Sequence, residues 1–565
     1  MATLERRAWI ALTGLLVLGG AFLLRETRGT TFWLDDWSWI LDRRGADVDT
    51  FLRPHNGHLS LVGVAIYKLL FATAGLEHHA PYCVIAIAAH LVCVTLIFAY
   101  ARRRVGGIGA LLAATLLLSF GPGWPDVLWP FQLGWLISLA AGVGCLLACD
   151  RADRIGDACL CALLTLSLAS SSLGIPIALG ILVELWLGRR RWRDAWVVAV
   201  PLALYAVWWV PYHDTGGFTR HNFLLAPAYV ADAAAAVTAA LAGLAGPVAL
   251  DDTGTLLDWG RPLLVGLSVL LAWRLARMRP VPVRVLSLVT VITSFWVLTA
   301  LNRATLSAPY SNRYLYVGGV FVVLLGVELA RGVEVSGRIR ALIAVAAAAA
   351  IVSNIGAFRD GSGYLRASAQ GTTADLGALE LARPLARADT VATGLPGYPL
   401  VIVKAGPYFS AERSLGSPAA SPTELLTMSA PARRVADAQL IAIHRVALAR
   451  SARQPGGGER LRVERATGGL VSQGDRACSV FAADTVGATG APHDVDITLP
   501  AAGVWLQADG GPVIVGVRRF GDDFQPVGGV ASGASAALRI APDLAADAWH
   551  VRFTPARRVT LCTRR

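Results

Sequence analysis

Long apolar segments alternate with short polar segments over the first 357 residues of the chain. A membrane-spanning helix needs about 20 apolar residues. Eleven segments reach or approach that length, at roughly 8–24, 80–101, 106–121, 131–149, 157–171, 173–188, 194–211, 261–277, 283–301, 314–330 and 339–357. The pattern predicts a polytopic α-helical membrane domain over residues 1–357.

Two further apolar segments are harder to place. Counting 58–76 as a span would move Arg102 to Arg104 to the other side of the membrane from the remaining arginine clusters. We therefore interpret 58–76 as an interfacial or re-entrant helix, with Lys68 reaching toward the interface. The Ala-rich segment 229–250 is similarly ambiguous. The loop 25–79 is then the long first outer loop.

The remainder of the chain has the pattern of a soluble domain. Residues 358–457 predict a mixed α/β region, with a helix at 375–387 and a strand at 400–403. From 458 onward, short β-branched and aromatic runs alternate with Gly-containing turns, which is typical of a β-sandwich. The sequence thus predicts a membrane domain followed by an α/β region at 358–457 and a β-sandwich-like domain at 458–565.

The distribution of charge supports this organisation and sets the expected topology. The chain is 55% hydrophobic and 16% charged, with a formal net charge of +12. The positive charges gather in short loops, as the positive-inside rule predicts for cytoplasmic loops, so they do not indicate a nucleic-acid partner. The clusters are Arg102 to Arg104, Arg151 with Arg154, Arg189 to Arg193, Arg274 to Arg284, and Arg331 to Arg340. Eleven spans with a cytoplasmic N-terminus place these loops inside and the C-terminal domain outside. The strong preference for Arg over Lys is typical of a GC-rich bacterial genome.

Two of the eight cysteines, Cys478 and Cys562, lie in the predicted outer domain. The other six lie in or beside the predicted spans. Because the outer compartment permits disulfides, we expect a Cys478–Cys562 bond that ties an early strand of the sandwich to its last strand.

The most unusual polar feature is the pair Asp35-Asp36, which follows the first span in the run Phe32-Trp33-Leu34-Asp35-Asp36-Trp37. Ionisable groups near lipid are costly and mark functional sites. The alternative is that one of the two caps a helix starting at Trp37, since Asp is a favoured N-cap residue.

Further candidates lie in the same set of predicted outer loops. His55 and His58 at i and i+3 could present two imidazoles on one helical face, for a metal, for a substrate, or simply as a polar helix start. Asp126 follows Trp124 and Gln132 follows Trp129 in a short outer turn, at the lip of the next helix. The tryptophans themselves fit an ordinary interfacial aromatic belt.

Arg303 and the run Ser311-Asn312-Arg313-Tyr314 lie on the predicted outer side, against the positive-inside trend. Guanidinium groups bind phosphate in a bidentate manner, so these arginines suit a lipid phosphate. The alternative is anchoring at the membrane interface.

An acidic pair after the first span, a long first loop, about eleven spans and an outer C-terminal domain together resemble the GT-C superfamily of membrane glycosyltransferases. The stretches Trp129-Pro130-Phe131-Gln132-Leu133-Gly134 and Ser311-Asn312-Arg313-Tyr314-Leu315-Tyr316 are also similar to patterns in uncharacterised actinobacterial proteins of this kind. The resemblance covers about 1–357.

The resemblance implies an enzyme of the bacterial plasma membrane that moves a sugar from a polyprenyl-phosphate donor to an extracytoplasmic acceptor hydroxyl on an envelope glycan, lipid or protein. Asp35 or Asp36 matches the general base in position, and Arg303 or Arg313 could stabilise the phosphate, with His55, His58, Asp126, Gln132 and Tyr314 as further substrate contacts. We expect a reaction without a cofactor, because no metal-ligand set is convincing, although a divalent metal is not excluded. A transporter or flippase of a lipid-linked substrate, or a non-catalytic scaffold that presents the C-terminal domain, are the alternatives.

Overall fold

The computed structural model describes residues 2–151, 153–188, 194–213, 219–245, 254–398, 402–451, 459–467, 471–473, 478–482 and 493–564. The chain forms two compact units. Unit 1 comprises Met1–Thr30 and Ser38–Arg366, and unit 2 comprises Thr31–Trp37 and Ala367–Arg565. The short segment Thr31–Trp37, which carries Asp35 and Asp36, therefore belongs to the same unit as the C-terminal residues.

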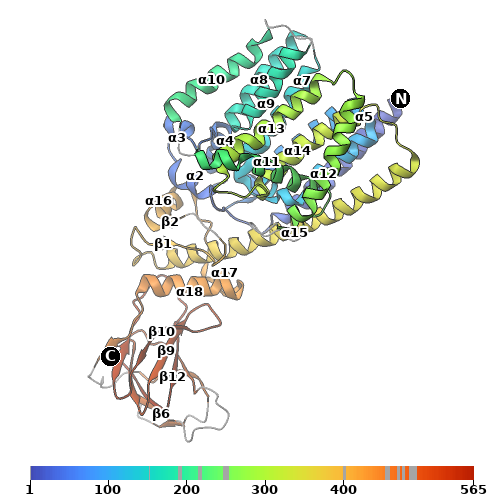
Figure 1. The fold of residues 1–565 in the computed structure, drawn as a ribbon. Helices are drawn as coiled ribbons and strands as arrows, with labels where there is room; N and C mark the ends of the chain where they lie inside the picture. The colour runs from blue at the N-terminus through green and yellow to red at the C-terminus, as the bar shows by residue number, and fades with distance from the viewer. Residues whose placement is uncertain are drawn as a thin grey trace. The chain divides into compact units, whose positions relative to one another are not determined.

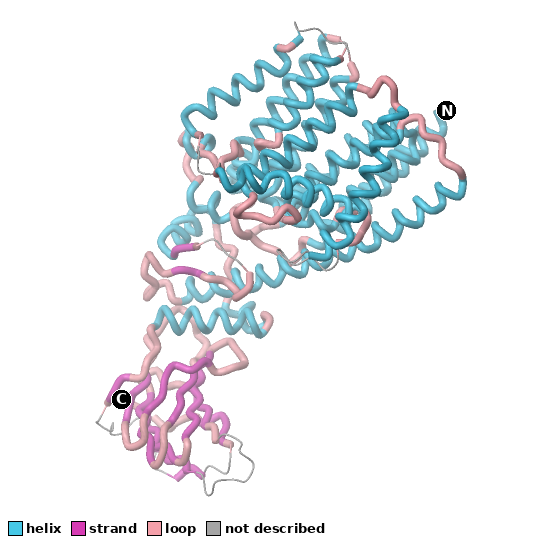
Figure 2. The backbone as a smooth tube through the Cα atoms, in the orientation of Figure 1, coloured by secondary structure: helices cyan, strands magenta, loops and turns pink. Residues whose placement is uncertain are grey.

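Unit 1 is helical (Figures 1 and 2). Its elements are α1 (Ala2–Glu26), α2 (Asp36–Asp42, which starts in unit 2), α3 (Val48–Leu52), α4 (Leu61–Thr73), α5 (Ala80–Leu118), η1 (Gly121–Gly123), α6 (Trp124–Leu128), η2 (Pro130–Gln132), α7 (Leu133–Cys149), α8 (Arg154–Ser170), α9 (Gly174–Leu187), α10 (Trp196–Tyr212), α11 (Arg220–Leu241), α12 (Gly254–Arg277), α13 (Val283–Arg303), α14 (Asn312–Ala330) and α15 (Gly337–Leu381, which ends in unit 2). Among the described residues, eight helices are long and apolar enough to cross a membrane.

The predicted spans correspond to these helices with informative exceptions. The spans 80–101 and 106–121 form one element, α5, in which Gly106 at φ 75° breaks the helical geometry where the sequence predicted a boundary. The spans 157–171, 173–188 and 194–211 become α8, α9 and α10, which have 17, 14 and 17 residues. Their lengths are below the roughly 20 residues that a perpendicular span needs. The arginine cluster at 189–193 lies outside the described residues.

Ion pairs gather the ends of several helices of unit 1 on one face, which we call the charged face. Arg104 bridges Glu328 and Asp150, with an N···O distance of 3.1 Å to Asp150. Arg284 bridges the same Asp150 at 3.2 Å and also pairs with Glu184. These contacts join the ends of α7, α9, α13 and α14 to α5 next to its break at Gly106, so the alternation predicted from charge is present within unit 1. Which face is cytoplasmic remains a prediction.

The opposite ends of the helices meet at a second face, which we call the polar-loop face. Here Ser362 donates to the Glu26 carbonyl at 2.6 Å, and Arg303 donates to the Asn56 carbonyl at 2.9 Å. Helix α11, which includes part of the ambiguous segment 229–250, has both of its ends toward this face. Its Asn222 donates to the carbonyl of Leu301 at the end of α13, and its Ala240 carbonyl accepts from Asn354. Although a 22-residue helix is about 33 Å long, α11 therefore does not change the predicted side of the helices that follow it.

The apolar segment 58–76 contains α4, a helix of only 13 residues, in agreement with the prediction that it does not span. Lys68 does not extend freely toward an interface. Its ammonium group donates to the Thr50 hydroxyl at 2.7 Å and lies 4.1 Å from the centroid of the Phe51 ring. The lysine thus ties α4 to α3.

The last helix of unit 1 differs from the prediction. The sequence predicted a span at 339–357 and a separate helix at 375–387, but α15 is one helix of 45 residues that ends at Leu381. The segment between the two predicted helices holds glycines but no proline, so nothing stops the helix there. Pro384 follows, and because proline disfavours helical geometry in the residues before it, the helix ends before the predicted 387.

Unit 2 continues with a small α/β region and then a β-sandwich. The region comprises β1 (Val391–Ala392), β2 (Val403–Lys404), α16 (Ala405–Leu415), α17 (Pro422–Thr427) and α18 (Ala430–His444). The predicted strand at 400–403 falls partly outside the described residues, and its described part contributes to β2. The sandwich strands are β3 (Ala449–Arg450), β4 (Val463–Ala466), β5 (Val471–Gln473), β6 (Cys478–Ala482), β7 (Val495–Thr498), β8 (Val504–Asp509), β9 (Val513–Arg518), β10 (Gln525–Val530), β11 (Ser535–Leu538), β12 (His550–Pro555) and β13 (Arg558–Thr563).

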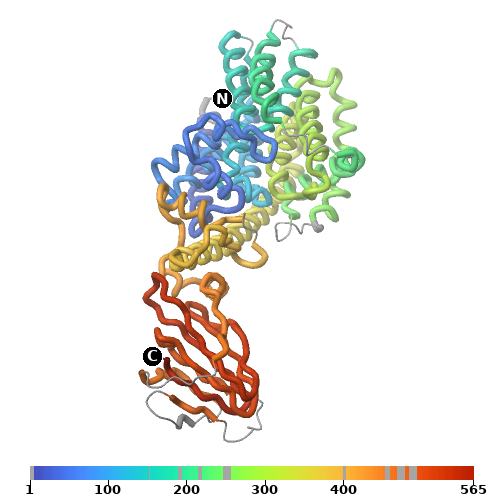
Figure 3. Tube along the Cα trace, turned by 90° about the vertical axis from the view of Figure 1, so that its left-hand side faces the viewer, coloured from blue at the N-terminus to red at the C-terminus, as the bar shows by residue number. Residues whose placement is uncertain are grey.

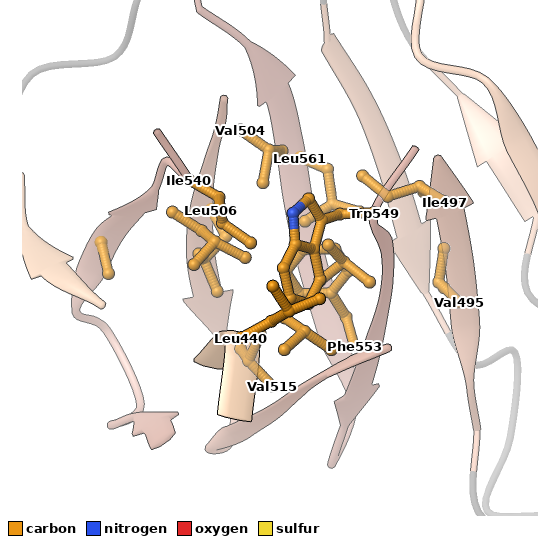
Figure 4. Close-up of a cluster of buried hydrophobic side chains, with 14 of the residues drawn as sticks. Leu440, Val495, Ile497, Val504, Leu506, Val515, Ile540, Trp549, Phe553 and Leu561 are labelled. Carbon is orange, nitrogen blue, oxygen red and sulfur yellow. The ribbon is translucent and has the colours of Figure 1, made fainter. Parts of the chain in front are cut away.

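The sandwich strands form two antiparallel sheets, with orders β10-β9-β12-β7-β4 and β3-β11-β8-β13-β6-β5. In Figure 3 the sandwich is the orange to red part of the chain. Alternate residues of strands such as β12 are buried, as expected for a sheet with one face on a core. Side chains from both sheets meet there with Leu440 of α18 and Trp549 (Figure 4). Cys478 and Cys562 lie opposite each other on β6 and β13 and form a disulfide. The predicted fold class, a polytopic helical domain with a C-terminal α/β and β-sandwich part, is confirmed.

Candidate functional site

The acidic pair lies in a tight turn within the segment Thr31–Trp37 of unit 2. The Asp36 carboxylate accepts from the backbone N–H of Trp33 at 2.8 Å, and the Asp36 N–H donates to the Trp33 carbonyl at 3.1 Å. Leu34, inside this turn, has φ 43°, which is unusual for a residue with a branched side chain. Backbone strain of this kind costs about 1–3 kcal/mol and clusters at functional sites.

The two carboxylates consequently have different surroundings. Asp36 is fully buried, and its side chain reaches back to close the turn, so it does not cap the following turn of a helix starting at Trp37 as one reading of the sequence suggested. Helix α2 begins at Asp36 itself. Asp35 is only half-buried. Of the pair, Asp35 is therefore the carboxylate that a substrate reaches more easily.

The run His55-Asn56-Gly57-His58 is a tight turn of unit 1, and the prediction of two imidazoles on one helical face is wrong. His55 and His58 exchange backbone hydrogen bonds of 3.0 and 2.9 Å across the turn. Asn56 and Gly57 have φ 50° and 81°. Two consecutive positive φ values are what a type I′ turn requires, and Asn-Gly is the preferred dipeptide for it.

The two histidines have separate environments. His58 Nδ1 lies 2.9 Å from the Ser172 hydroxyl, which is 3.1 Å from the Tyr205 hydroxyl. Burial, followed by the charges of Arg303 and His55, lowers the pKa of His58 to about 4, so it is neutral at physiological pH. The His55 ring lies 5.0 Å from the ring of Phe131, between centroids.

Arg303 stabilises this turn through its bond to the Asn56 carbonyl. This contact gives Arg303 a structural task that the sequence did not reveal. Arg313 is exposed, at the start of α14, and its guanidinium carbon lies 5.8 Å from the centroid of the Tyr314 ring. Arg313 is thus the more available of the two candidate phosphate-binding arginines.

Asp126 is the most unusual residue of the site in unit 1. It lies on α6, is 0% exposed, and neither of its carboxylate oxygens has a hydrogen-bond partner in the part of the chain that the structure describes. Burial raises the pKa of Asp126 well above its usual range, and the charge of Arg313 opposes that shift. A buried polar group without a partner typically costs about 1–3 kcal/mol.

Asn312 shares this property and was not singled out as a site residue from the sequence. It is 2% exposed, and both atoms of its side-chain amide lack partners among the described residues. Asn312 precedes Arg313, whose charge acts on Asp126. It also lies one helical turn before Tyr316, on which the charge of Asp126 acts. The signal that could have revealed it was a polar amide at the start of an otherwise apolar helix.

The remaining predicted residues line the same part of unit 1. Gln132 is 4% exposed in η2, directly before α7. Tyr314 is 7% exposed, and its ring stacks on Trp135 with centroids 6.2 Å apart. The charge of Arg313 acts on Asp126, and its guanidinium lies over the Tyr314 ring, which places these three residues in one group. The charges of Arg303 and His55 act on His58, which places these three in another.

The carboxylates and histidines of the described segments do not assemble into a cation site. Among those residues, no group of three or more His, Cys, Asp or Glu is placed to hold a metal ion. What the arrangement offers is hydrogen bonding from Asp126 and Asn312, and positive charge from Arg313. These groups suit a hydroxylated ligand that carries an anion.

No protein-family model and no curated protein sequence matches the chain. Solved structures that resemble it include ArnT from Cupriavidus metallidurans in the apo state, at TM-score 0.45 and 14% identity over 75% of this chain and 91% of that one. ArnT bound to undecaprenyl phosphate matches at TM-score 0.42 and 14% identity, over 73% of this chain and 85% of that one. The arabinosyltransferase EmbB from Mycobacterium smegmatis matches at TM-score 0.34 and 13% identity, over 98% of this chain and 64% of that one. With TM-scores below 0.5, these similarities do not by themselves assign a family or an activity.

Proposed function

We propose that the chain is a membrane glycosyltransferase that moves a sugar from a polyprenyl-phosphate donor to an acceptor hydroxyl. The observation that carries the proposal is the group formed by Asp126, Asn312 and Arg313. Two buried polar side chains without partners among the described residues, beside an exposed guanidinium, are costly for folding alone. A bound sugar phosphate would supply what they lack, because its hydroxyls both donate and accept hydrogen bonds and its phosphate is an anion.

The reaction assigned to these residues is a single displacement. The acceptor hydroxyl attacks the anomeric carbon, the bond from that carbon to the phosphate oxygen breaks, and the hydroxyl proton passes to a general base. We assign the base to Asp35, because it is the more exposed of the two carboxylates. Direct attack with one base inverts the anomeric centre.

The departing polyprenyl phosphate gains negative charge as the bond breaks. A fixed cation near that oxygen stabilises the transition state more than the ground state, which lowers the barrier. We assign this role to Arg313 in preference to Arg303, which donates to the Asn56 carbonyl. Arg313 also follows directly on the first residue of α14, where the free N–H groups of a helix favour an anion.

The test is transfer from a panel of radiolabelled polyprenyl-phosphate sugars, with the purified chain in lipid vesicles that contain envelope extract as acceptor. The proposal predicts transfer of label by the wild type and a loss of about 10²-fold or more in turnover for Arg313→Ala. Arg303→Lys is the matched control and is expected to retain most of the turnover, because lysine can also donate to the Asn56 carbonyl. Wild-type vesicles that transfer no label from any donor would refute the proposal.

The same vesicles separate the enzyme from the alternatives. A flippase would move labelled lipid between leaflets without forming a product, and a scaffold would do neither. Movement of the donor without product formation, abolished by Arg313→Ala, would favour the flippase and contradict the glycosyltransferase.

A further inference from the structure

A cavity of about 520 Å³ lies within unit 2, beside the end of α18, and none of the site residues described above lines it. Its volume is in the range of small-molecule binding sites, about 300–1,000 Å³. The lining residues come from the segment after α15, from α18 and from the loop before β12: Leu385, Arg387, Thr390, Val391, Gln439, Ala442, Ile443, His444, Arg445 and Ala541.

The charged lining of the cavity is basic. Arg387 and Arg445 contribute two guanidinium groups, and none of the lining residues, all of them within the described part of unit 2, is Asp or Glu. Arg387 pairs with Asp389 at 3.0 Å, but both side chains of this pair are about two-thirds exposed, at 67% and 68%. An exposed pair of this kind contributes little stability, so an anionic ligand can replace Asp389 at low cost.

Arg445 occupies a position at which glycine is the usual residue. It has φ 50°, and it follows the last residue of α18, where its N–H donates to the Ala442 carbonyl at 3.2 Å. Helices commonly end with a glycine in this left-handed conformation, because a side chain there is strained. An arginine that lines a cavity at a position where glycine would stabilise the fold better indicates a use for its side chain.

One wall of the cavity is held rigidly by a buried network. His444 Nε2 lies 2.9 Å from the carboxylate of Asp543, and Arg519 donates to the same carboxylate at 2.6 Å. The three side chains are 0%, 1% and 4% exposed. His444 Nδ1 is also buried and has no partner among the described residues. Because these side chains are fixed, the backbone of His444 and Arg445 is positioned before any ligand binds.

Two neutral side chains add hydrogen-bonding capacity. Gln439 uses its amide nitrogen to donate to the Val391 carbonyl at 3.1 Å, which leaves its amide oxygen as an acceptor. The Thr390 hydroxyl oxygen accepts from the N–H of Arg387 at 3.1 Å and keeps its own proton to donate. A ligand with hydroxyl groups can use both.

The charge of the ligand follows from the helix end. The carboxyl end of α18 carries partial negative charge, which disfavours any anion beside it and a dianion such as phosphate more than a singly charged group. The two arginines among the lining residues offset this cost for a single negative charge. A carboxylate has a single charge and matches the fork of a guanidinium in geometry. We propose that this cavity binds a hydroxylated carboxylate, of the sugar-acid class, with Arg387 and Arg445 on its carboxylate and with Thr390 and Gln439 on its hydroxyls.

The test is binding of glucuronate to the full-length chain in detergent, measured by isothermal titration calorimetry. Glucose, which has the same sugar ring without the carboxylate, is the neutral control ligand. We expect saturable binding of glucuronate and none of glucose. Arg387→Ala and Arg445→Gly should each weaken glucuronate binding about tenfold or more, since each removes a charge-assisted hydrogen bond. Arg539→Ala removes an exposed charge of unit 2 that does not line the cavity, and it should leave binding unchanged.

Arg445→Gly keeps the proposal testable even if other variants fold poorly, because glycine readily adopts φ 50°. The unfolding temperature of this variant should be unchanged or higher than that of the wild type. The proposal is overturned if glucuronate does not bind, if glucose binds equally well, or if Arg445→Gly binds glucuronate like the wild type. Displacement of glucuronate by an equal concentration of inorganic phosphate would overturn the assignment of a singly charged ligand. None of these outcomes depends on glycosyl transfer by unit 1.

Discussion

Replacing Asp126 by leucine should stabilise unit 1 while it abolishes transfer. Both carboxylate oxygens of Asp126 are buried without partners among the described residues, and burial raises the pKa of this carboxyl. A buried, unsatisfied polar group costs about 1–3 kcal/mol, and an apolar side chain of similar size removes that cost. We therefore expect Asp126→Leu to raise the free energy of unfolding by about 1–3 kcal/mol.

Asp437 is the matched control, because it is equally buried but fully partnered. It is 0% exposed, and its carboxylate accepts from the backbone N–H groups of Arg519, Phe520 and Gly521 at 3.0, 2.9 and 2.9 Å. Asp437→Leu leaves these three donors without that acceptor. Each unpaired N–H donor costs about 1 kcal/mol or more, so Asp437→Leu should destabilise unit 2 by about 3 kcal/mol or more.

The chain itself provides a probe for unit 1. The six free cysteines all lie in unit 1, and Cys83, Cys93 and Cys145 are buried. A thiol-reactive dye therefore reports the thermal unfolding of unit 1 in detergent, whereas the two cysteines of unit 2 are joined in a disulfide. Scanning calorimetry follows the Asp437 variant.

The expected result for Asp126→Leu is an unfolding temperature of unit 1 that rises by up to about 2–4 °C for each kcal/mol. Transfer should fall to background in the same preparation. Gain of stability with loss of function is the behaviour of a residue retained for its chemistry. An Asp126→Leu chain that unfolds earlier than the wild type would refute the reasoning, as would one that transfers sugar at the wild-type rate.

Three further predictions concern stability. Burial opposes ionisation of Asp543, but hydrogen bonds from His444 and Arg519 prevail and lower its pKa to about 2. A carboxyl whose pKa is depressed in the folded state contributes stability at pH values above its unfolded pKa, so unit 2 should lose about 2 kcal/mol as the pH falls from about 4 to 2. Calorimetry should show a smaller loss of stability on acidification for Asp543→Asn than for Asp523→Asn, since Asp523 is exposed. Replacing Cys478 and Cys562 together by serine opens a loop of 84 residues and should cost unit 2 about 4 kcal/mol, and an unchanged midpoint in denaturant would contradict this. Gly57→Ala should cost about 1 kcal/mol through its φ of 81° alone, since no atom lies within 4 Å of the added Cβ. Gly121→Ala should fail to give folded protein, because the added Cβ would lie 1.8 Å from the Asn354 carbonyl oxygen. Equal yields and equal dye-monitored midpoints for the two variants would show the close approach at Gly121 to be wrong.

The membrane helices and the sandwich could be predicted because their signals are periodic and extend over many residues. Runs of about 20 apolar residues mark spans, and alternating strands with Gly turns mark a sandwich. The Cys478–Cys562 pair followed from the compartment and the cysteine count. The end of α15 was predicted less well, because helix ends depend on local breakers such as Pro384 and not on a pattern that extends over many residues.

The site was harder to predict because its geometry depends on contacts between distant segments. The i, i+3 spacing of His55 and His58 suggested a helix, although the Asn-Gly dipeptide between them favours a type I′ turn. Nothing in the local sequence shows that Arg303 donates to the Asn56 carbonyl, 247 residues away. Likewise, only the packed structure shows that Asp126 and Asn312 are buried without described partners while Asp437 is satisfied.

The assignment of roles within Asp35-Asp36 likewise needed the structure. The sequence left open which carboxylate is the base. The different exposure of the two carboxylates favours Asp35. This assignment is the central claim of the proposed mechanism.

The most direct test compares Asp35→Asn with Asp36→Asn in the vesicle transfer assay, with unfolding temperatures measured on the same preparations. Asparagine keeps the shape of the side chain and removes its ability to act as a base. The account predicts that Asp35→Asn lowers turnover by about 10²–10⁴-fold with little change in unfolding temperature. Asp36→Asn should retain most of the turnover, because an amide oxygen still accepts from the Trp33 N–H. Wild-type turnover in Asp35→Asn would contradict the account.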